Sequence, residues 1–142
     1  MLVNGTLFNS EAWHSVSVKD ILLLERVDEA LLKGLLQSHS KIPTEALYLE
    51  TNSVPICFIL SSRRLMYLHG ILQRDQHELV KKVYDAQKGD TSPGDFCQLV
   101  GEDKGNIDIT MTDSDIASIT KNRFKKIIKD KIRKAAFEYL KL

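Results

Sequence analysis

Long apolar runs are missing from this sequence. The longest uninterrupted ones are Ile21–Leu24 and Ile56–Leu60, far short of the about 20 residues that a helix needs to cross a bilayer. The first residues also lack the basic segment and the continuous apolar stretch of a secretory signal. We therefore expect an intracellular protein, nuclear or cytoplasmic, that has no membrane partner.

Cysteine and glycine are scarce, and neither forms a motif. Cys57 and Cys97 are far apart, and no Cys-x-x-Cys or His-x-His accompanies them, so the sequence signals neither a disulfide framework nor a metal site. The seven glycines are isolated, whereas a phosphate-binding loop needs several at fixed spacing. Since no Gly-x-Ser-x-Gly elbow marks a nucleophilic serine either, we expect no cofactor and no self-contained active site.

What is present is the pattern of one helical domain. Of the 142 residues, 43% are apolar and 27% are charged, as in ordinary globular domains. The Gly-, Pro- and Asp-rich segment 88–94 is typical of a linker or loop. It separates a helical core over 1–87 from a C-terminal helical subdomain over 95–142, which ends in a basic amphipathic helix, and the two can also pack as one domain over 1–142.

Apolar residues recur with the helical period, and strand patterns are almost absent. We expect an all-α, irregular bundle of about five to seven helices, with one short extended segment near 107–111. Leu24, Val27, Leu31 and Leu35 form an apolar stripe on one expected helix. The expected helices span about 18–37, 43–50, 55–73, 76–87 after a cap at Asp75, 113–119 and 121–140, with one or two turns over 95–102.

Positive charge is concentrated at the C-terminal end. The last 22 residues contain nine Lys or Arg and two acidic residues, a net +7, while the whole chain carries +1. A basic amphipathic helix of this kind can follow a phosphate backbone, and Arg63 with Arg64 forms a second basic point. The candidate nucleic-acid-binding residues are Lys121, Arg123, Lys125, Lys126, Lys129, Arg133, Lys134, Arg63 and Arg64.

Plainer interpretations stay open for these residues. The basic helix face can simply be solvated, and Arg63 and Arg64 can pair with a carboxylate such as Glu25 or Glu50. The residues Trp13, Tyr48, Tyr67 and Phe124 could stack on bases but fit a core better. Another hypothesis is a small nuclease that uses Asp108, Asp113 and Asp115. Carboxylates near helix starts, however, usually cap those helices.

Several short motifs follow one another in a defined order along nearly the whole chain. The first is Leu-Phe-Asn-Ser-Glu-Ala-Trp at 7–13, and others lie at 18–21, 24–28, 39–43, 46–50, 54–56, 62–65, 67–69, 124–126 and 135–140. This ordered set resembles LINE-type (non-LTR) retrotransposon reverse transcriptases. In those enzymes a signature similar to 7–13 lies in the thumb, just beyond the palm, so the resemblance makes the core over 1–87 thumb-like.

The resemblance implies a mostly helical region that grips a template–primer, as RNA, DNA or hybrid, by backbone contacts beside a palm domain. The family's Tyr-Ala-Asp-Asp-type metal-binding motif, nuclease domain and Cys/His zinc knuckle are missing from this sequence. We therefore expect no catalysis by this chain alone, which is at most a fragment of an RNA-directed DNA polymerase. The alternative is a protein-interaction module with no nucleic-acid role, in which exposed Leu2, Leu7, Phe8 and Trp13 drive homodimerisation or docking onto another protein.

Overall fold

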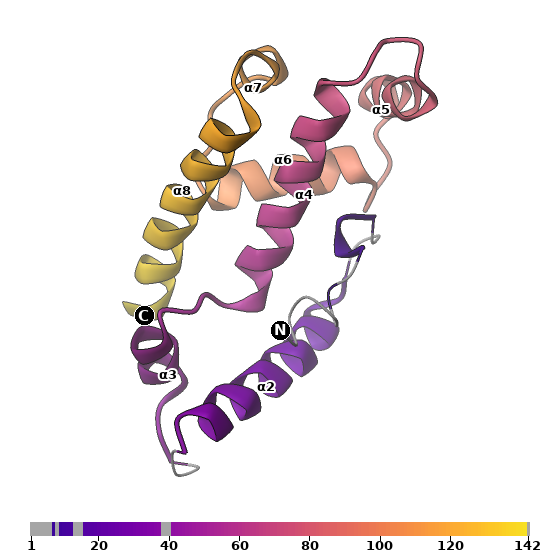
Figure 1. The fold of residues 1–142 in the computed structure, drawn as a ribbon. Helices are drawn as coiled ribbons and strands as arrows, with labels where there is room; N and C mark the ends of the chain where they lie inside the picture. Colours follow the sequence, from indigo (N-terminus) through magenta and orange to yellow (C-terminus); the bar gives the residue numbers. More distant parts are fainter. Residues whose placement is uncertain (1–6, 8, 13–15, 38–40, 142) are drawn as a thin grey trace.

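A computed structural model of the chain describes residue 7 and residues 9–12, 16–37 and 41–141, which form helices joined by short connections (Figure 1). No strand occurs in these ranges, so the expected all-α bundle is confirmed. The elements are the 3-10 turn η1 (Ser10–Ala12) and the α-helices α2 (Val18–Leu35), α3 (Thr44–Thr51), α4 (Ile56–Leu72), α5 (Leu79–Gly89), α6 (Phe96–Asn106), α7 (Asp113–Ser118) and α8 (Lys121–Lys141).

Local hydrogen bonds set several helix ends. The Ser17 side chain accepts from the Asp20 backbone N–H at the start of α2, and Thr112 with Asp115 forms a reciprocal capping box at the start of α7. Each pair has the three-residue spacing that is typical of a capping box. The prediction that Asp75 caps a helix beginning at 76 is wrong. Its carboxylate accepts from the backbone N–H of His77, and α5 begins only at Leu79.

Helix α4 is the central element. It packs against η1, α2, α5, α6, α7 and α8, and Figure 1 shows α8 running antiparallel beside it. The core contains Leu65 and Leu68 of α4, Phe124 and Ile128 of α8, and Ile107 of the connection before α7. This core joins residues from both sides of the 88–94 segment, in which Lys88 and Gly89 end α5 and 90–94 belong to the connection to α6.

Helix α2 packs over a narrower face than its apolar stripe predicts. It contacts α3 and α4 and buries Leu32 and Asp28, whereas the stripe residues Val27 and Leu35 are 51% and 79% exposed. The partners of α2 thus meet it from one side. No helix in the described ranges combines the length and the apolar composition that a bilayer crossing requires.

The exposure expected for Leu7 is also wrong. Leu7 is fully buried and packs with Ile56 and Leu60 of α4, and its backbone carbonyl accepts a hydrogen bond from Arg63. Leu2, Phe8 and Trp13, the other residues of the expected dimerising surface, lie outside the described residues.

A buried ion pair joins α4 to α6. Arg64 Nε lies 3.4 Å from Asp103 Oδ2, with side chains that are 12% and 7% exposed, and Ser61 Oγ donates a 2.7 Å hydrogen bond to Asp103 Oδ1. Burial raises the pKa of the Asp103 carboxyl, while Arg64 and Ser61 oppose that rise. The carboxylate that pairs with Arg64 is therefore on α6, and not one of the two considered from the sequence.

Removing one partner of this pair is expected to destabilise the protein more than replacing both. Asp103→Ala leaves a buried guanidinium without its counter-ion, and we expect the free energy of unfolding to fall by about 3 kcal/mol. Replacing the pair with Arg64→Met and Asp103→Leu together is expected to lower it by no more than about 1 kcal/mol. Urea denaturation compares the two variants, and a double variant less stable than Asp103→Ala would contradict this account.

Candidate nucleic-acid interface

A basic cleft of about 760 Å³ lies where α8, α4, α2 and the connection between α3 and α4 meet. We call it the α4–α8 cleft. Four cationic side chains line it: Lys125, Lys129 and Arg133 of α8, and Arg63 of α4. Asp28 of α2 is the one acidic residue among the lining residues. Four of the nine cations predicted from the sequence are thus brought together in one place.

The helical period puts the three cations of α8 on one line. They follow one another at intervals of four residues, each about 6 Å of axial rise. The residues directly before Lys125, Lys129 and Arg133 are Phe124, Ile128 and Ile132, which are buried in the core. The core thereby fixes the rotation of α8 and holds these cations at its edge. None of the three makes an ion pair or hydrogen bond within the part of the chain that the structure describes.

Arg63 reaches the cleft from α4. Its Nη1 donates a 2.6 Å hydrogen bond to the backbone carbonyl of Leu7, and that carbonyl belongs to a fully buried residue. The anchored guanidinium therefore has a defined position beside the cleft. A planar guanidinium presents five N–H donors in a fixed geometry that matches phosphate.

Asp28 opposes these cations. It is buried on α2, and the Tyr48 hydroxyl donates to its carboxylate over 3.4 Å. Burial raises the pKa of the Asp28 carboxyl, while the hydrogen bond from Tyr48 lowers it. Burial and the neighbouring charge of Asp28 also raise the pKa of Glu25. The cleft thus combines four cations with one partly desolvated acid.

The other predicted cations lie apart from the cleft. Arg123, Lys126 and Lys134 are exposed on α8 but are not lining residues of the cleft. Lys121, at the start of α8, lines a separate small pocket beside Arg74. Arg64 forms the buried ion pair with Asp103.

The aromatic residues considered for base stacking have mixed positions. Tyr48 and Phe124 are buried, as expected of core residues, whereas Tyr67 is exposed and packs edge-on against Phe96. Trp13 lies outside the described residues. Asn52 and Ser53, which line the cleft, were not predicted, because periodicity carries no signal for loop residues that enter a site.

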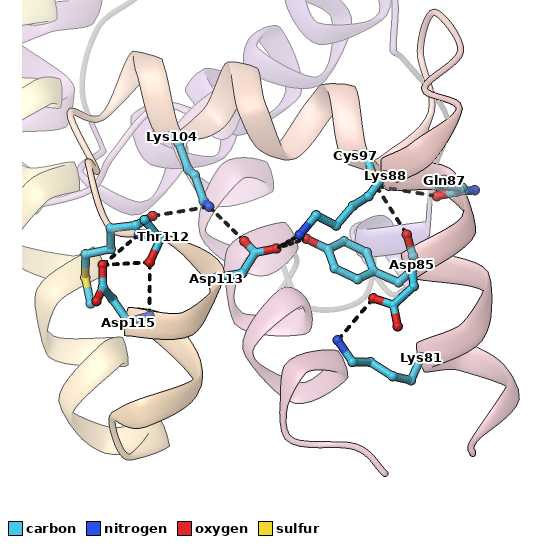
Figure 2. A network of polar contacts seen from close by, with 11 residues as sticks. Lys81, Asp85, Gln87, Lys88, Cys97, Lys104, Thr112, Asp113 and Asp115 are labelled. Atoms are coloured by element: carbon cyan, nitrogen blue, oxygen red, sulfur yellow. Dashed lines mark hydrogen bonds and ion pairs between the residues drawn. The ribbon is translucent and has the colours of Figure 1, made fainter. Parts of the chain in front are cut away.

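A second polar cluster joins α5, α6 and α7 (Figure 2). The Asp113 carboxylate accepts hydrogen bonds from Tyr84 at 2.7 Å, Lys88 at 2.8 Å and Lys104 at 3.2 Å. Asp115 is taken up by the capping box, and Asp108 pairs with Lys131 at 3.1 Å. No three metal-ligating side chains gather as a cation site among the described residues, so these carboxylates do not form the cluster that the nuclease hypothesis requires.

The partners of Asp113 change its acidity. Burial raises the pKa of its carboxyl, but the hydrogen bonds from Lys88, Tyr84 and Lys104 outweigh burial and lower the pKa to about 2 from an ordinary 3.8. An acid whose folded pKa is depressed stabilises the folded state above its unfolded pKa, and that stabilisation is lost as the pH falls through the folded pKa. For Asp113 the loss falls between about pH 4 and pH 2.

We expect Asp113→Asn to lower the free energy of unfolding by about 1–2 kcal/mol at neutral pH, and progressively less as the pH approaches 2. This figure allows for solvent screening, since the Asp113 side chain is 22% exposed. Urea denaturation across the pH range measures it. The control is Asp108→Asn, whose carboxylate is 78% exposed, with an expected effect below about 0.5 kcal/mol. An equal loss for Asp113→Asn at both ends of the range would refute the electrostatic explanation.

Comparison with known proteins identifies no relative of this chain. No protein-family model, no curated protein and no solved structure matches the chain.

Proposed function

We propose that this chain is a non-catalytic, nucleic-acid-binding helical region that holds a sugar–phosphate backbone in the α4–α8 cleft. The observation that carries the proposal is the row of Lys125, Lys129 and Arg133, which make no ion pair within the described residues and share the cleft with Arg63. Cations that neutralise phosphates release condensed counterions, which favours binding.

Contacts of this kind recognise the charge of the phosphate backbone and not the base sequence. Lys and Arg side chains that meet phosphate oxygens position a protein on a strand, while base edges carry sequence information. The resemblance to LINE-type reverse transcriptases supplies a context for such an interface. In it, the chain grips a template–primer as the thumb and following region of a polymerase, next to a palm domain.

The salt dependence of binding tests the proposal, with two variants that each remove two positive charges from α8. Lys125→Ala with Lys129→Ala removes cations of the cleft, and Lys126→Ala with Lys134→Ala removes exposed cations outside it. In a plot of log affinity against log salt, the slope falls by about 0.7–0.9 for each phosphate that the protein no longer neutralises. We expect the cleft variant to lower it by about 1.5 and the control variant to change it little.

The measurement is fluorescence anisotropy with a labelled RNA–DNA hybrid that carries a single-stranded overhang, from low to physiological salt. Circular dichroism of both variants checks that α8 still folds. Equal losses of affinity in the two variants would show that the overall charge of α8, and not the cleft, governs binding. If the unaltered protein does not bind even at low salt, the nucleic-acid proposal is wrong.

A further inference from the structure

The spacing of the three cleft cations along α8 is close to the spacing of phosphates along one nucleic-acid strand. The axial rise of about 6 Å between successive members of the row is close to the separation of neighbouring phosphates along a single backbone. Lys125, Lys129 and Arg133 can therefore each meet one of three consecutive phosphates. The row follows one helix, so it offers this match to one strand at a time.

The size of the cleft favours a single strand as well. The cleft is open to solvent and has a volume of about 760 Å³. A double helix carries two backbones around stacked base pairs, and its major groove alone is about 12 Å wide. A single strand therefore fits this space more closely than a duplex, which brings a second backbone with it.

The cleft also has an apolar lining. Phe58 and Ile132 belong to the buried core, and Val54 and Ile59 are half-buried, whereas the cations of α8 are exposed. Proteins that bind single strands combine a basic groove with side chains, most often aromatic, on which unpaired bases lie. The paired bases of a duplex are stacked inside the helix and could not use this surface.

The Asp28 carboxylate adds discrimination. A strand whose phosphates follow α8 turns its bases toward the apolar lining, while a second backbone in the same space would bring phosphates toward Asp28 of α2. Placing like charges together disfavours the wrong ligand. We infer that the α4–α8 cleft binds a single strand of RNA or DNA, with phosphates along α8 and bases against the half-buried Val54 and Ile59. This inference rests on the proposed function and specifies its ligand.

The test compares three labelled ligands of one sequence, about 12 nucleotides long: an RNA strand, a DNA strand and the blunt RNA–DNA hybrid. At physiological salt we expect the tighter-binding strand, which identifies the ligand, to bind the full chain about tenfold more tightly than the hybrid does, a difference of about 1.4 kcal/mol. In the variant carrying Lys125→Ala and Lys129→Ala, the salt slope for that strand should fall by about 1.4.

The possible failures are distinguishable. A blunt hybrid that binds as tightly as either strand, and loses affinity equally in the Lys125→Ala, Lys129→Ala variant, would overturn the single-strand inference and leave the nucleic-acid function standing. Absence of binding to all three ligands would overturn both. Asp28→Asn provides a second measurement, since removing the carboxylate should narrow the difference between strand and hybrid. An unchanged difference would contradict the role given to Asp28.

Discussion

The burial of α4 among the other elements is the constraint on which the rest of the structure depends. Helix α4 packs against η1, α2, α5, α6, α7 and α8, and its two adjacent arginines leave it in different directions because neighbouring residues of an α-helix do not share a face. Arg64 meets Asp103 of α6 inside the fold, and Arg63 meets the Leu7 carbonyl beside the α4–α8 cleft. The same burial fixes α8, whose core residues hold the neighbouring cations at the edge of that cleft.

The division of charge follows from this packing. Several acids of the C-terminal half have internal partners: Asp103 pairs with Arg64, Asp108 with Lys131, and Asp113 with Lys88 and Lys104. The cations of α8 that face the cleft have no such partner among the described residues. Positive charge therefore remains available in the cleft of a chain whose net charge is only +1, and this local excess matters more for phosphate binding than the net charge does.

Local sequence patterns predicted most of the helices, but they did not predict the contacts between segments that are distant in the sequence. Capping spacing and apolar periodicity located α2, α4, α7 and α8 because these signals act within a few residues. The period also identifies which face of α2 is apolar, but not whether a partner covers it, so the exposure of Val27 and Leu35 was missed. Within the site, position relative to Phe124 and Ile128 could have separated Lys125 and Lys129 from Lys126. The positions of Arg63 and Asp28 in the α4–α8 cleft depend on tertiary packing, which local sequence patterns do not predict.

Mapping backbone amide NMR shifts while a short RNA or DNA strand is added tests the central claim most directly, because it locates the bound strand without altering any residue. The account predicts that the largest shifts fall within 52–63 and 125–133, on the two sides of the α4–α8 cleft, with α5 and α7 nearly unchanged. Shifts concentrated in α5 and α7, around the Asp113 cluster, would contradict it.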